Sequence, residues 1–157
     1  MNLDKLNKWL TLAANLGVIA GIVFLAFELQ QNNRFLSAQA QYNLLKDRTE
    51  DNTIIMANPE VASLWYKVKI NESLTDEEIF RVDAFVVKAL LNWQYEYNQY
   101  NEGNLTMEEL PVNAWRVSYH ESNYLMSTSR YPVVWDSIKT VFEPDFVSFM
   151  EENVINP

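Results

Sequence analysis

The chain has 157 residues, with 21 Asp and Glu against 12 Lys and Arg and a formal net charge of -9. This acidic balance argues against a protein that binds nucleic acid through its phosphates, because phosphate neutralisation requires clustered Lys and Arg. The absence of cysteine excludes disulfides, thiolate nucleophiles and zinc sites of the Cys type. The length is that of one ordinary domain.

The first predicted element is an apolar helix from Trp9 to Leu29. Only Thr11, Asn15 and Glu28 carry clearly polar side chains in this stretch, and about 20 helical residues cross about 30 Å of hydrocarbon. Residues 16–27 are apolar on every face, whereas a core helix of a soluble bundle usually keeps a polar stripe. The segment lacks the small-residue cleavage site of a signal peptide. We therefore predict a transmembrane helix.

One face of this span carries Ala14, Gly17, Gly21 and Glu28, which fall on one stripe at 100° per residue. A Gly-x-x-x-Gly pair lets a second helix approach closely. The stripe predicts helix association with a second copy or with a partner membrane protein, although small residues are also common in spans that do not associate. The position of Glu28 at the end of the span favours a carboxylate that reaches headgroups and water, and a buried acid is the alternative.

The basic residues around the span do not determine its orientation. Lys5 and Lys8 precede it, and Arg34, Lys46 and Arg48 follow it. The side of the membrane that carries more Lys and Arg is usually cytoplasmic. Because the two sides are nearly balanced, the location of the C-terminal domain stays open.

A helical stripe continues from the span without Gly or Pro until Pro59, so one helix is expected to leave the membrane and enter the next domain. This stripe consists of Phe35, Ala38, Tyr42, Leu45 and Thr49. Asn58 is the expected cap of a short second helix that begins at Pro59.

A central helix is predicted between the capping box Thr75-x-x-Glu78 and Gly103. Its expected core side chains recur at helical spacing: Ile79, Val82, Val86, Leu90, Trp93, Tyr97 and Tyr100. No window shows the alternation of a strand.

A second capping box, Thr106-x-x-Glu109, predicts the start of a helix that contains Trp115, and two shorter helices are expected near Pro132 and Pro144. The predicted fold is all-α, with an N-terminal transmembrane helix that continues into a small helical bundle. The expected division is an anchor over residues 1–35 and a helical domain over residues 36–157.

The residues that carry chemistry are sparse. His120 is the single histidine, so a di-iron site with two Glu-x-x-His pairs cannot be built. Ser118, Ser122 and Asp136 would complete the residue types of a triad with His120, but no nucleophile motif surrounds them. No phosphate-binding glycine loop occurs. We predict no catalytic, metal or cofactor site.

Aromatic residues make up 13% of the chain. Their helical spacing favours a core of large rings, and a ligand pocket or a protein interface is the alternative. Two sets of polar or amphipathic residues are candidates for such a surface. The first set lies off the main stripe of the central helix and consists of Tyr95, Asn98 and Gln99. The second set would supply polar contacts for a ligand and consists of Glu96, Arg116 and His120.

Several segments in order resemble a widespread family of short bacterial proteins with one N-terminal span and a helical C-terminal domain. These segments are "GVIAGIVFLAFELQQNNR", "NPEVASLWYKV", "SLTDEEIFRVDAF", "YNQYNEGNL" and "YPVVWDSIKTVFEPDFVSFM". The resemblance implies a single-pass protein of the bacterial inner membrane and leaves the activity unassigned. The family often has an acid nine residues before the glycine of the central helix, where this chain has Gln94.

Two functions remain as hypotheses. The first is a membrane-anchored interaction or assembly module that self-associates through its transmembrane helix, with the lipid bilayer and a second copy or another membrane protein as partners. The second is a sensor that binds a small molecule or a lipid in an aromatic-lined helical pocket.

Overall fold

The computed structural model describes residues 3–121 and 127–157, apart from the side chains of residues 47, 48 and 51. The chain divides into two units, Met1–Gln39 and Ala40–Pro157. The described residues form helices and no strand, which confirms the predicted all-α fold.

Helix α1 extends from Leu3 to Ala57 without a break, so the helix that begins in the apolar segment does continue into the second unit. It ends where the sequence indicates. The Asn58 side chain accepts hydrogen bonds from the backbone N–H groups of Glu60 and Val61, and Pro59 occupies the first position of α2, Pro59–Lys69. The fixed φ of proline suits this position, where its missing N–H costs nothing.

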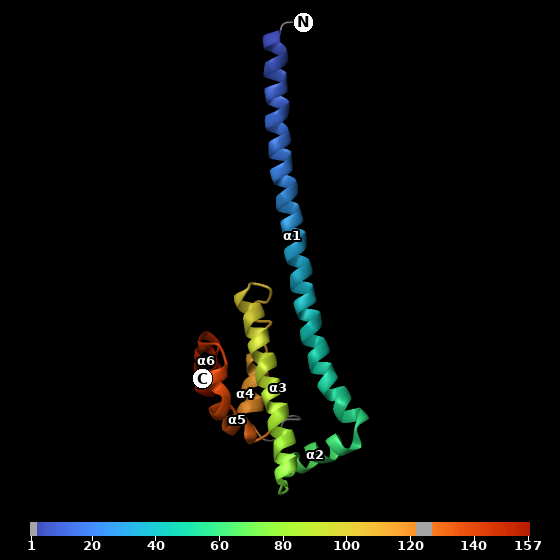
Figure 1. Ribbon diagram of the computed structural model, residues 1–157, viewed down its shortest axis with the longest axis vertical. Helices are drawn as coiled ribbons and strands as arrows, with labels where there is room; N and C mark the ends of the chain where they lie inside the picture. The colour runs from blue at the N-terminus through green and yellow to red at the C-terminus, as the bar shows by residue number, and fades with distance from the viewer. Residues whose placement is uncertain (1–2, 122–126) are drawn as a thin grey trace. The chain divides into compact units, whose positions relative to one another are not determined.

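Helix α3, Asp76–Asn101, has both bonds of the predicted capping box between Thr75 and Glu78. Its end is also as predicted, because Gly103 has a φ of +76°, the left-handed conformation that glycine adopts most readily. Within the second unit α3 runs antiparallel to the C-terminal part of α1, and α2 connects the two (Figure 1).

The remaining elements are α4 (Val112–His120), α5 (Arg130–Ile138), the 3-10 helix η1 (Lys139–Val141), α6 (Pro144–Met150) and the π-helical turn η2 (Glu151–Ile155). The expected helix start at Thr106 is wrong. The Glu109 carboxylate accepts a bond from the Thr106 N–H as a capping box would, but α4 begins only after Pro111. A residue before proline is disfavoured in helical conformation, so Leu110 interrupts the helix.

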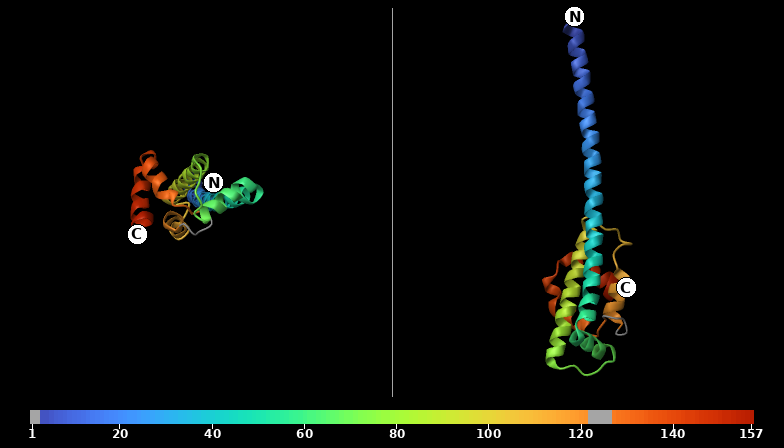
Figure 2. Two further views of the ribbon diagram at one scale, coloured as in Figure 1. Left: turned by 90° about the horizontal axis from the view of Figure 1, so that it is seen from below. Right: turned by 90° about the vertical axis from the view of Figure 1, so that its right-hand side faces the viewer.

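The core of the second unit is built on aromatic rings from several helices. Trp93 of α3 stacks between Trp115 of α4, at 5.4 Å between ring centroids, and Tyr131 of α5, at 5.3 Å. Phe146 of α6 is fully buried and packs edge to face on Trp135. These contacts hold α4, α5 and α6 beside α3 (Figure 2). The rings fill the core, as their helical spacing predicted.

Candidate functional site

The described residues contain one helix that is long and apolar enough to cross a membrane, and it lies near the N-terminus within α1. None of its most apolar 18-residue window is buried. A core helix of a soluble protein with this composition would bury most of that surface, because apolar area is stabilised by removal from water. Within the described residues this segment is therefore a candidate membrane span whose apolar surface is exposed.

The predicted association stripe is open in the first unit. A Cβ atom added at Gly17 or at Gly21 meets no other atom within 4 Å, and Ala14 and Glu28 are exposed. No contact among residues 3–121 and 127–157 explains the two glycines, which lower helix propensity by about 1 kcal/mol each relative to alanine. Close approach of a second helix would explain them.

Of the residues of α3 expected to form a binding surface, only Tyr95 is exposed. Tyr95 is 41% exposed, whereas Glu96 is buried with 5% exposure. The Asn98 side chain donates to Glu143, 3.2 Å away, and Gln99 bonds to Asn104 and Glu102 beyond the helix end. The Asn98 amide therefore connects α3 to the start of α6, and the Gln99 amide bonds to the turn that ends α3. Tyr95 alone of this set presents a large exposed side chain.

Arg116 and His120 lie one turn apart on α4 and both contact the end of the chain. Arg116 Nε donates to the carbonyl oxygen of Asn153, and His120 Nε2 lies 2.8 Å from that of Val154. Helix ends leave carbonyl groups without partners. These side chains thus hold the π-helical turn η2 against α4. Because their partners are backbone atoms, no side-chain pattern could indicate this role.

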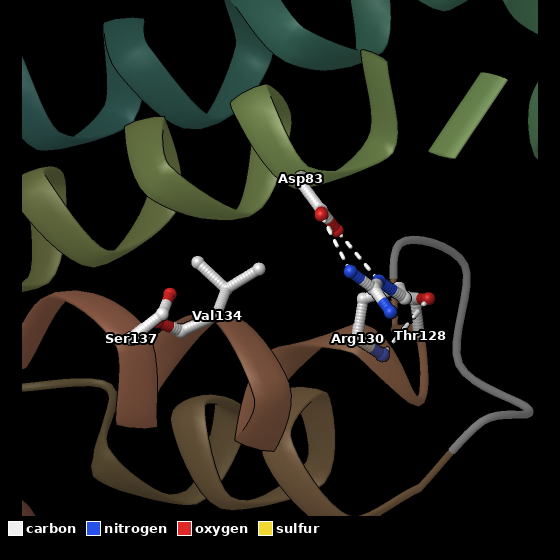
Figure 3. Close-up of polar contacts among 5 residues, drawn as sticks. All are labelled: Asp83, Thr128, Arg130, Val134 and Ser137. Carbon is white, nitrogen blue, oxygen red and sulfur yellow. Dashed lines mark hydrogen bonds and ion pairs between the residues drawn. The ribbon is translucent and has the colours of Figure 1, made fainter. Parts of the chain in front are cut away.

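An ion pair connects α5 to α3 and was not predicted. Arg130 donates two parallel bonds to the Asp83 carboxylate, at 2.7 and 2.6 Å, and both side chains are about two-thirds to three-quarters buried (Figure 3). The pKa of Arg130 is raised, chiefly by this hydrogen bond. The neighbouring Thr128 is buried and its hydroxyl accepts the Arg130 N–H. The cluster satisfies its own charges, so it fixes the start of α5.

A second ion pair connects α2 to the start of α3. Lys67 Nζ lies 2.7 Å from one Glu78 oxygen, and the Thr75 N–H donates to the other. The hydrogen bond from Lys67, followed by the one from Thr75, lowers the pKa of Glu78. Glu78 therefore serves the helix cap and the contact between two helices at once.

Low pH should remove the contribution of the Glu78 carboxylate to the stability of the fold. A carboxyl group whose pKa is lower in the folded chain stabilises the fold above its unfolded pKa and loses that effect as the pH falls through the folded value. We expect Glu78→Gln to be less stable than the unmodified chain at pH 7, and the difference to shrink below about pH 4.5. Urea unfolding at both pH values measures it. The matched control is exposed Glu108→Gln, and an equal pH dependence for both variants would contradict the assignment.

Two small apolar grooves flank Trp65 of α2. One, of about 240 Å³, is lined by residues that include Ile55, Tyr66 and Lys69. The other, of about 230 Å³, includes Ile54 and Phe85, whose ring meets Trp65 edge to face. Both volumes are below the roughly 300–1,000 Å³ of most small-molecule sites.

No reactive cluster forms among the described residues. Within residues 3–121 and 127–157 no group of three or more His, Asp or Glu side chains converges as metal ligands do. Ser122, one of the serines considered for a triad with His120, lies outside the described residues. The Nε2 atom of His120 contacts a backbone carbonyl.

Comparisons with known proteins give no relative for this chain. It matches no protein-family model, no curated protein and no solved structure.

Proposed function

We propose that this chain is a single-pass protein of the bacterial inner membrane, and that it acts as an assembly module. Its apolar helix anchors the helical unit and associates with a second copy. The observation that carries this proposal is the unburied apolar window of α1. A surface of that kind, about 20 residues long, is stable when hydrocarbon surrounds it.

The second unit supports an interaction role more than a pocket role. Three of its four tryptophans, Trp93, Trp115 and Trp135, are buried against other rings. The polar residues that a ligand would use are either buried, as Glu96 is, or bound to backbone, as Arg116 and His120 are. The surface of this unit, rather than its interior, is therefore where a partner would bind.

The alternative function is a sensor that binds a lipid or a small molecule, and the grooves beside Trp65 are the observation that favours it. Their size suits a single acyl chain segment better than a drug-sized molecule. Native mass spectrometry of the purified full-length chain would show a bound ligand as a defined added mass, which Trp65→Ala should remove.

The self-association part of the proposal is tested with Gly17→Leu/Gly21→Leu. Leucine at both positions prevents close backbone contact, so the protein concentration at which the oligomer half-dissociates in mild detergent should rise at least about tenfold, equivalent to about 1.4 kcal/mol. Sedimentation velocity measures this. The control, Ala26→Leu, adds bulk on the opposite side of the helix and should leave the mass unchanged. Equal behaviour of the two variants would contradict association through the glycine stripe.

A further inference from the structure

The part of α1 within the second unit, Ala40–Ala57, has apolar side chains on two opposite faces. Ala40 and Leu44 are buried, at 3% and 5% exposure, in the main core. Tyr42 lies about 160° around the helix from Ala40 and Leu44, and Leu45 lies about 100–140° from them. Tyr42 and Leu45 are 67% and 61% exposed. Met56 is 79% exposed. The unit therefore packs on one apolar face of this helix and leaves the other uncovered.

The uncovered face follows a heptad repeat. Steps of three and four residues alternate without interruption from Phe35 to Met56 through the positions that we call the seam: Phe35, Ala38, Tyr42, Leu45, Thr49, Asn52 and Met56. None of these residues is charged. The charged residues of the same stretch all occupy other positions: Lys46, Asp47, Arg48, Glu50 and Asp51. This arrangement is that of the a and d positions of a coiled coil.

The other apolar residues nearby have partners within the second unit. Ile54 and Ile55 line the grooves beside Trp65 on α2. The main core therefore accounts for Ala40 and Leu44, and Ile54 and Ile55 line the grooves beside Trp65, whereas Tyr42, Leu45 and Met56 remain exposed. Burial of a side chain such as Tyr42, which is 67% exposed among the described residues, against a second chain would remove substantial apolar area from water.

The seam also shares its register with the glycine stripe. Fourteen residues, two heptads, separate Gly21 from Phe35, and one heptad separates Glu28 from Phe35. A sequence that maintains a seven-residue repeat over several heptads favours a left-handed supercoil of helices. Two copies anchored in one membrane point the same way, so identical seam residues of parallel helices would face each other.

We propose that the seam is a homodimer interface, in which Phe35 to Met56 pairs in parallel and in register with the same residues of a second copy. The inference rests on the proposed membrane anchor for the parallel direction. Thr49 and Asn52 place polar groups at single a and d positions, which fix register at a cost in stability. The Thr49 hydroxyl already bonds to the Leu45 carbonyl, at 2.9 Å, so it tolerates an apolar interface.

Single cysteines test the pairing cleanly, because the natural chain has none. In a parallel, in-register pair the Cα atoms of Leu45→Cys from two copies approach within the roughly 4.4–6.8 Å that a disulfide requires. The full-length variant is expressed in bacterial membranes and treated with a mild oxidant. Glu50→Cys is the control, since Glu50 is exposed on the same helix but outside the seam. Leu45 is itself exposed, so its replacement removes no core contact.

We expect Leu45→Cys to give the disulfide dimer at least about tenfold faster than Glu50→Cys, as proximity in a fixed geometry would. Tyr42→Cys should behave like Leu45→Cys. If the two variants formed the disulfide at equal rates while the chain still floated with the bilayer, the seam would not be an interface. The membrane anchor would not be affected by that result. If the disulfide product of Leu45→Cys did not have twice the mass of the chain, the partner would be another protein and the homodimer would be contradicted. Rapid cross-linking in a chain that does not float would support the seam and contradict the anchor.

Discussion

Replacing Trp93 with alanine should destabilise the second unit by about 3–5 kcal/mol, the usual cost of removing a large aromatic side chain from a core. Trp93 is 7% exposed and its ring stacks on Trp115 and on Tyr131 with interplanar angles of 15° and 6°. Each such pair adds about 0.5–1.5 kcal/mol beyond burial. Because a domain is stable by only about 5–15 kcal/mol, this one change should bring the unit close to its unfolding threshold.

Urea unfolding of the full-length chain in mild detergent, followed by near-ultraviolet circular dichroism, measures this loss. Leu91→Ala is the matched control, because Leu91 lies on the same helix and is 51% exposed, and surface changes of this kind usually stay within about 0.5 kcal/mol. Trp93→Phe should lose less than Trp93→Ala, since it retains one ring. If Trp93→Ala and Leu91→Ala shifted the midpoint equally, the stack would not hold the three helices together.

Two arginines in the apolar segment should release the chain from the membrane. An arginine near the centre of a transmembrane helix costs about 2.5–3.5 kcal/mol on insertion scales. Val18 and Ile22 lie near the middle of the segment and are 62% and 61% exposed, so no neighbouring side chain in the described part of the first unit covers the new charges. Val18→Arg/Ile22→Arg should therefore lower insertion by about 5–7 kcal/mol if the two costs add.

The fraction of chain that resists an alkaline wash of the membranes measures this insertion. Asn101→Arg/Asn156→Arg adds the same two charges to exposed positions of the second unit and should leave that fraction unchanged. A loss from the membrane in both variants would indicate a charge effect on the whole chain rather than on the apolar segment.

Local signals predicted most of the helix boundaries. Asn58 with Pro59, the box of Thr75 with Glu78, and Gly103 each act within four residues, and the structure has all three as expected. The helix start predicted from the box of Thr106 with Glu109 was wrong, because a capping interaction starts a helix only when the residues after it can continue in helical conformation. Only a single turn forms after Thr106, through the bonds from the Glu109 and Leu110 N–H groups to its carbonyl oxygen, before Pro111 stops it, and α4 begins after Pro111.

The sequence could not show which of two apolar faces of α1 meets the core. The stripe from Phe35 to Thr49 has the larger side chains, yet the small Ala40 and its neighbour Leu44 are the buried pair. Hydrophobic periodicity shows which residues share one face of a helix, but it does not show what that face packs against, because the packing involves helices distant in the chain. The pair Asp83 and Arg130, 47 residues apart, is hidden for the same reason.

The candidate polar residues of α4 show a further limit. Arg116 and His120 have the side chains that a ligand site would use, but both contact carbonyl groups of the last helical turn. Backbone carbonyls occur at every position of a sequence, so composition cannot indicate which of them needs a donor. The tertiary packing of α4 against η2 decides it.

Flotation of the unmodified full-length chain after an alkaline wash tests the membrane anchor most directly. The account predicts that the chain stays in the bilayer fraction at high pH and moves with the vesicles to the top of a density gradient, because α1 crosses the hydrocarbon. Recovery of the chain as a soluble oligomer, with residues 9–29 protected from protease, would contradict it. In that case protein rather than lipid would cover the apolar helix.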